Sequence, residues 1–85
     1  ELMVQMKECA IFFFFFREQE AYGRLNEMLP LLNQTLQSAI QFSAEMERIV
    51  VLVLNQFLEA YQRRDNLALA DLLDYEIPAI ITAVN

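Results

Sequence analysis

The sequence predicts an all-α fold, and three observations lead to that prediction. The chain of 85 residues contains one glycine and two prolines, too few for the tight turns of a β-sheet protein. More than half of the chain, 56%, is apolar. The apolar residues recur every three or four positions, which is the period of an amphipathic helix. We therefore expect residues 1–85 to form a single helical domain, a four-helix antiparallel bundle built from two helical hairpins.

Two apolar faces characterise the third helix, which we expect at about residues 44–63. Its inner face consists of Phe42, Met46, Ile49, Val50, Val53, Phe57, Ala60 and Tyr61. A second apolar strip, Val51, Leu54 and Leu58, lies beside that face. We therefore expect this helix to be covered on more than one side.

The fourth helix, at about residues 66–84, separates outer from inner positions with the same period. Its expected outer face consists of Asp71, Asp74, Pro78, Thr82 and Asn85. Its expected inner face consists of Leu69, Leu72, Leu73, Ile77, Ile80 and Ile81. A β-strand, with its period of two residues, does not produce this pattern.

The candidate residues for the hairpin turn and the rim of the bundle are Arg64, Asp65, Tyr75 and Glu76. Arg63 and Arg64 close the third helix, because positive charge is favoured at a helix C-terminus. Asp65 or Asn66 suits the N-cap of the fourth helix, and Ser43 suits the N-cap of the third. We expect Tyr75 to pack its ring and to leave its hydroxyl at the rim, near an arginine of the turn. Glu76 is expected at the edge between core and solvent.

The first two helices, at about residues 2–16 and 19–42, differ in character. The second places Pro30 on its solvent side, where a missing N–H costs least. The first contains a run of five phenylalanines that also suits a β-strand, although a single strand would have no partner in a helical chain. As a helix, this run is apolar on every side, and one bundle buries only part of it. The candidate dimer contact consists of Ile11, Phe12, Phe13, Phe15 and Phe16.

The two halves of the chain resemble each other at an offset of 48 residues. Leu25-Asn-Glu-Met-Leu-Pro30 aligns with Leu73-Asp-Tyr-Glu-Ile-Pro78. Two related hairpins, with turns at residues 17–19 and 63–65, would explain the alignment. The alternative is chance, because leucine-rich helices align easily.

Two short phrases resemble a recurring signature of small, uncharacterised helical proteins from Gram-positive bacteria. They are Phe16-Arg-Glu-Gln-Glu-Ala-Tyr22 and Asp65-Asn-Leu-Ala-Leu-Ala-Asp-Leu-Leu-Asp-Tyr-Glu-Ile-Pro78. The second is similar to the phrase D-x-x-L-x-A-D-L-L-x-Y-E-x-x-P that closes such chains. The resemblance implies a bacterial helical bundle and no particular activity. The chain departs from the pattern in its phenylalanine run and in the lack of a glycine at its first turn.

Charge and cysteine content limit the classes of partner. A net charge of −6 without a basic stripe argues against nucleic acid and against an anionic membrane surface. The apolar run after Lys7 is too short to span a bilayer, and no small-residue cleavage site follows it. Cys9 is the only cysteine, so nothing indicates an oxidising compartment. We expect a cytoplasmic protein.

The residue types disfavour an enzyme. Histidine is absent, which removes the usual general base and the commonest zinc ligand. Cys9 adjoins an apolar run, a setting that raises the pKa of a thiol, so we expect it to be buried and inert. Asp71 and Asp74 share an outer helical face and are expected to be solvated rather than to hold a metal. We therefore assign no catalytic, cofactor-binding or metal-ligating residue.

Three functions are compatible with these features. The leading hypothesis is a non-enzymatic bundle that forms a homodimer through its phenylalanine run and takes part in protein–protein interaction. A second is a secretion or flagellar export chaperone that holds an amphipathic client segment in a groove. A third is a carrier of a small apolar ligand, with Phe13, Phe14 and Phe57 lining a cavity between helices.

Overall fold

The computed structural model describes residues 2–84, which leaves Asn85 of the expected outer face outside the described part. Three long helices come first: α1 (Leu2–Phe14), α2 (Glu18–Ile40) and α3 (Ala44–Arg63). The last segment is one continuous helix in three parts, α4 (Asn66–Asp71), a π-helical turn η1 (Leu72–Glu76) and α5 (Ile77–Val84). The predicted all-α bundle is confirmed, with α1 and α2 slightly shorter than expected.

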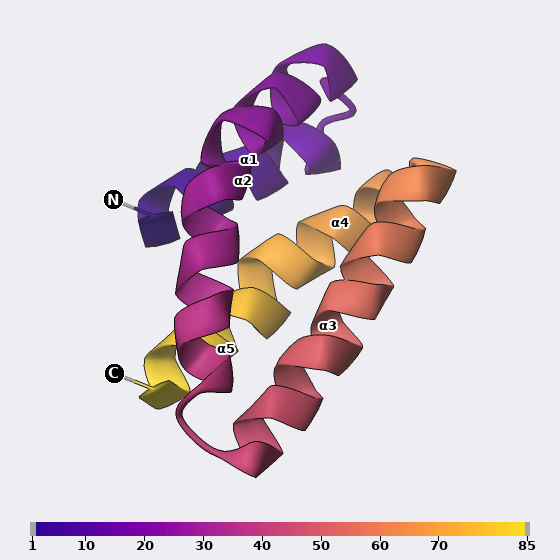
Figure 1. The fold of residues 1–85 in the computed structure, drawn as a ribbon. Helices are drawn as coiled ribbons and strands as arrows, with labels where there is room; N and C mark the ends of the chain where they lie inside the picture. The colour runs from indigo at the N-terminus through magenta and orange to yellow at the C-terminus, as the bar shows by residue number, and fades with distance from the viewer. Residues whose placement is uncertain (1, 85) are drawn as a thin grey trace.

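The helices form two layers (Figure 1). In this view α2 and α3 lie in front and are joined at the bottom by a short loop, from which they diverge. Behind them, α1 lies beside the upper part of α2, and α4 and α5 run obliquely across the back. The shortest extent of the molecule, 19 Å, corresponds to two layers of packed helices.

Both hairpin turns have the same backbone geometry, 48 residues apart. Phe16 (φ 57°) and Arg64 (φ 54°) are the two non-glycine residues with positive φ in residues 2–84. The N–H of Arg17 donates to the Phe12 carbonyl, and the N–H of Asp65 donates to the Ala60 carbonyl, both at 2.9 Å. These bonds are the six-to-one bonds of the Schellman motif, which satisfies carbonyls at a helix C-terminus. The sequence echo therefore extends to the geometry of the turns.

The predicted N-caps are present. The Ser43 hydroxyl accepts from the Met46 N–H at 3.0 Å, and the Asp65 carboxylate accepts from the Ala68 N–H at 3.2 Å. Each cap satisfies an N–H group that has no partner within its helix. Together they fix where α3 and α4 begin.

The expected position of Pro78 on the outer face is wrong, since Pro78 is buried. Pro78 cannot donate a hydrogen bond, and in a regular α-helix its ring would clash with the carbonyl of Asp74. The wider turn η1 lies directly before it, with the Ile77 N–H bonded to the Leu72 carbonyl. This turn changes the helical phase and rotates Pro78 inward. Pro30, its counterpart in α2, is exposed as predicted.

The core is apolar, with no buried polar or charged residue among residues 2–84. The largest fully buried side chains come from all the long helices and include Phe13, Leu36, Val50 and Leu73. The accessible surface of 5393 Å² is near the roughly 5,200 Å² expected of a compact 10 kDa chain. The chain is therefore compact, and large apolar side chains, among them Phe15 and Phe16, remain exposed on its surface.

Replacing Ser43 by alanine tests the cap of α3. Ser43→Ala is expected to lower the free energy of unfolding by about 1 kcal/mol, because the Met46 N–H loses its partner. Urea unfolding followed by circular dichroism measures the change. Ser38→Ala, an identical exchange at an exposed position inside α2, should leave stability unchanged or slightly raised. Equal losses for both variants would contradict the assignment.

Candidate functional site

An aromatic junction joins the two hairpins at the end where their turns meet. The Tyr22 ring packs edge-on against Phe13 of α1 and Tyr61 of α3, with centroid distances of 5.0 and 5.7 Å. Its hydroxyl donates to Oδ1 of Asn66 at 3.0 Å, and the Arg64 guanidinium lies 4.1 Å from its ring centroid. Burial raises the pKa of the Tyr22 hydroxyl, against the opposing effect of the positive charge on Arg64. This junction fixes the phenylalanine run beside the second turn.

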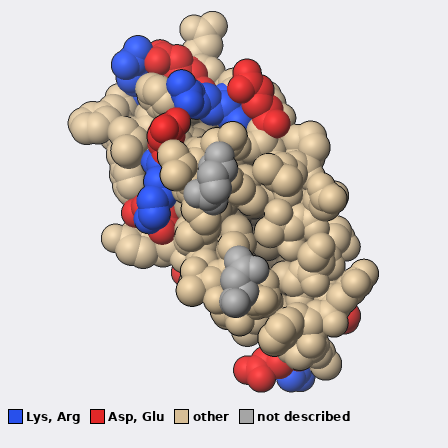
Figure 2. Space-filling model, turned by 90° about the vertical axis from the view of Figure 1, so that its left-hand side faces the viewer, with Lys and Arg blue, Asp and Glu red and all other residues tan. Residues whose placement is uncertain are grey.

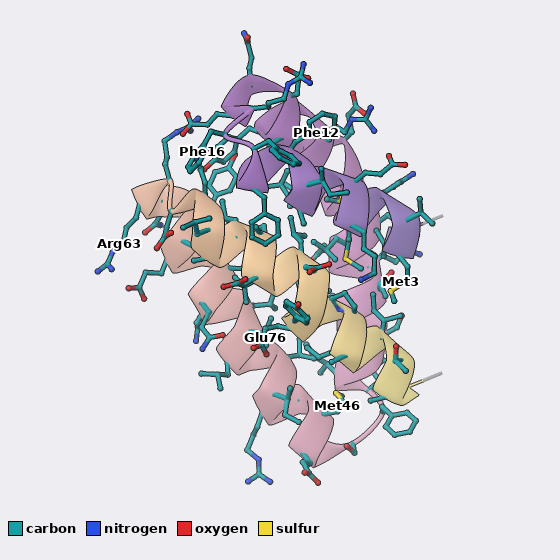
Figure 3. The ribbon with its side chains drawn as sticks, turned by 180° about the vertical axis from the view of Figure 1, so that it is seen from behind. Met3, Phe12, Phe16, Met46, Arg63 and Glu76 are labelled. Atoms are coloured by element: carbon teal, nitrogen blue, oxygen red, sulfur yellow. The ribbon has the colours of Figure 1, made fainter. Side chains whose placement is uncertain are left out.

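The exposed part of that run is here called the phenylalanine end and consists of Ile11, Phe14, Phe15 and Phe16. Phe15 and Phe16 are 72% and 71% exposed, although each carries a full aromatic ring. Both follow the last residue of α1, where the chain turns towards α2. Figure 3 shows Phe16 at the same end of the molecule as Arg63, beside the turn of the second hairpin.

Two members of the predicted contact lie elsewhere. Phe13 is fully buried against Tyr22, so its assignment to a surface contact is wrong. The cause is the helical period, which turns Phe13 to the same face as Met6. Phe12 is half-buried, because the guanidinium groups of Arg24 and Arg17 lie 5.0 and 5.6 Å from its ring centroid. Ile11, Phe15 and Phe16 are exposed as expected, and Phe14 joins them.

Two ion pairs lie near the phenylalanine end. Arg24 contacts Glu8 at 3.0 Å and Arg17 contacts Glu20 at 2.7 Å. A second copy could therefore approach this end without meeting an excess of negative charge, although the whole chain carries −6. All these pairs are solvent-exposed, so each contributes little to stability.

The second strip of α3 is only partly covered by the rest of the chain, although we expected this helix to be covered on more than one side. Val51 is 47% exposed and Leu58 is 55% exposed, whereas Leu54 is half-buried. Leu54 and Leu58 form one wall of a groove between α2 and α3. The groove has a volume of about 270 Å³, and its other lining residues are Leu29, Leu32, Asn33, Leu36, Phe57 and Ile77. The Tyr61 hydroxyl donates to Oδ1 of Asn26 at 3.3 Å and bridges α3 to α2.

The four predicted rim residues are not brought together. Arg64 and Asp65 form the second turn, but Tyr75 is 68% exposed and its ring is not packed. The arginine of the turn stacks on Tyr22 instead, because η1 lies more than one helical turn beyond it. Glu76 lines a shallow apolar hollow between α3 and α5, together with Met46 and Ile80. Figure 3 shows Glu76 beside α3.

Asp74 lies in an ion pair that the sequence did not predict. It is half-buried and contacts the Lys7 ammonium of α1 at 3.2 Å. Asp71 is exposed as expected. Within residues 2–84, no group of three or more cysteine, aspartate or glutamate residues is arranged to hold a metal ion. In the same range, no helix is both long enough and apolar enough to cross a membrane.

Cys9 is fully buried, as predicted, and its thiol donates to the Ala21 carbonyl at 3.3 Å. Burial raises the pKa of this thiol to about 12, in spite of the positive charge on Arg24. The thiolate is the reactive form of cysteine. The native thiol is therefore held in its unreactive form near neutral pH.

Charged residues are distributed unevenly over the surface. Figure 2 shows most of the blue and red side chains at the upper end of the face in view and a few at its lower end, with a broad uncharged area between them. The sequence explains this, because no charged residue occurs between Glu27 and Glu45 or after Glu76. The lower parts of α2 and α5 are therefore uncharged.

Comparison with protein-family models, curated proteins and solved structures found no match. The resemblance to small helical proteins of Gram-positive bacteria therefore stays a prediction. The sequence predicted the phenylalanine end and the second strip of α3, but not the groove, which depends on how α2, α3 and α5 pack together.

Alkaline titration tests the burial of Cys9. An unfolded chain ionises its thiol above about pH 9, whereas the folded chain keeps its thiol neutral up to about pH 12. The contribution of Cys9 to stability is therefore complete below pH 9 and is lost as the pH rises towards 12. Urea unfolding at several pH values, compared with Cys9→Ala, measures it. Identical alkaline slopes for both proteins would contradict the buried neutral thiol.

Proposed function

We propose that this chain is a non-enzymatic protein-interaction module that associates with further copies of itself through its phenylalanine end. The observation that carries the proposal is the exposure of Phe15 and Phe16, each more than two-thirds exposed beside Ile11. Fully burying a phenylalanine side chain contributes roughly 1.5–3 kcal/mol. A partner that covers both rings on each copy therefore adds a favourable contribution to association.

A second copy is the partner that fits this end best. The ion pairs of Arg17 and Arg24 leave its charges locally balanced, so two identical ends do not repel each other. An isologous contact also brings the same rings from both copies together, and aromatic pairs have favourable edge-on geometries. We further propose that the protein works in the bacterial cytoplasm, where a single unpaired cysteine is ordinary.

A client helix is the second candidate partner, as in an export chaperone. The groove between α2 and α3 favours it, because its lining is apolar apart from Asn33. A small-ligand carrier is less well supported. The groove volume of about 270 Å³ lies below the roughly 300–1,000 Å³ typical of ligand pockets. Of the three phenylalanines expected to line a cavity, only Phe57 reaches the groove.

Removing the two rings tests the proposed association. The double variant Phe15→Ser, Phe16→Asn should lower the mass measured by size-exclusion chromatography with light scattering at micromolar concentration. Asparagine tolerates the positive φ at position 16, so the turn should be kept. The wild-type chain is expected above its monomer mass of 10.0 kDa.

The matched control is Phe42→Ser, which removes a phenylalanine that is 62% exposed near the opposite end of α2. This variant should keep the wild-type mass. A wild-type chain that stays at 10.0 kDa over the whole range would contradict the proposal, as would an equal effect of Phe42→Ser.

A further inference from the structure

The second strip of α3 has the spacing of a helix-pairing seam. Val51, Leu54 and Leu58 follow each other at intervals of three and four residues. This is the alternation that brings one helix alongside another in a coiled coil. The inner face of α3 already packs on the core through Val50, Val53 and Phe57. The strip is therefore a second seam, in which Val51 and Leu58 stay about half exposed.

We propose that α3 of a second copy covers this strip in an antiparallel, two-fold symmetric pair centred between Leu54 and Asn55. The proposal extends the proposed self-association to a second surface of the same chain. In this arrangement Val51 of each copy faces Leu58 of the other. The second helix also lies over the mouth of the groove between α2 and α3, beside Leu29 and Asn33.

The charges of α3 fit this register. Arg48 lies near one end of the strip and Glu59 near the other, on the same flank of the helix. An antiparallel pair therefore places Arg48 of each copy close to Glu59 of the other, and it places Glu47 next to the amide of Gln62. A parallel pair would instead place Glu47 of one copy against Glu47 of the other in the seam. Opposite charges at the flanks of a seam select orientation and partner.

The rims of the strip favour a second copy over other proteins. Asn55 and Gln62 flank it on α3, and Asn33 lines the opposite wall of the groove. An amide both donates and accepts hydrogen bonds, so amides from two identical surfaces can pair with each other. In the antiparallel register the Asn55 side chains of the two copies lie on the same flank, close to the two-fold axis.

Cross-linking at Asn55 tests the register. The axes of packed helices lie about 8–10 Å apart, so Asn55→Cys places two thiols within reach of a short bismaleimide. The matched control is Gln56→Cys, since Gln56 is also an exposed amide but points about 100° away around the helix. The native Cys9 thiol is buried and should not react. We expect a several-fold greater yield of cross-linked dimer from Asn55→Cys.

Two further variants separate this inference from the proposed function. Adding Leu58→Glu to Asn55→Cys should abolish the cross-link, and Leu58 is exposed enough to be replaced without unfolding the chain. Adding Phe15→Ser and Phe16→Asn should leave the cross-link in place. Equal yields at positions 55 and 56, no cross-link at either, or loss of the cross-link with the phenylalanine variants would overturn the inference. The proposed function is tested separately, by the mass of the double variant Phe15→Ser, Phe16→Asn without the added cysteine.

Two separate contacts on one chain would change the number of copies in the complex. Each isologous contact joins two copies, so a chain with two different contacts builds a complex of more than two copies. Leu58→Glu alone should leave only the phenylalanine contact and reduce the complex to a dimer. A wild-type complex whose mass is unchanged by Leu58→Glu would count against the α3 contact.

Discussion

The junction at Tyr22 is the interaction on which the arrangement of this bundle depends. Its ring and hydroxyl contact side chains from α1, α3 and α4, so one residue of α2 joins both hairpins. A side-chain amide hydrogen bond from Asn66 to the Glu18 carboxylate reinforces the same place. The junction holds α2 and α3 together at one end of the molecule, where the Tyr61 hydroxyl also bonds to Asn26. Between that end and the loop that joins them, the two helices diverge (Figure 1). The groove follows from that divergence.

The two hairpins have the same turn geometry, but their helices do not pack equally closely. At the offset of 48 residues, Cys9 and Ala10 of α1 correspond to Phe57 and Leu58 of α3. The small side chains of Cys9 and Ala10 let α1 pack closely, as the thiol bond to the Ala21 carbonyl shows. Leu58 is too large to be enclosed in the same manner and is half exposed. One hairpin therefore completes the core, and the other presents an apolar strip.

Helical periodicity was sufficient to predict most of the fold. The helices, the caps at Ser43 and Asp65, the buried Cys9 and the second strip of α3 all follow from local spacing and capping chemistry. Pro78 escaped prediction because η1 changes the helical phase, and a π turn leaves no mark on an apolar pattern. Phe13 could not be separated from its neighbours, because five identical residues in a row have no polar face. The Lys7–Asp74 pair and the groove depend on contacts between distant segments.

We propose that further copies of this chain cover the apolar residues that one copy leaves exposed. Small-angle X-ray scattering over a range of micromolar concentrations tests this claim most directly, because it reports mass and size together. The account predicts a mass above 10.0 kDa and a radius of gyration clearly larger than the 12.2 Å of a single chain. A profile that fits the single chain at every concentration would contradict it.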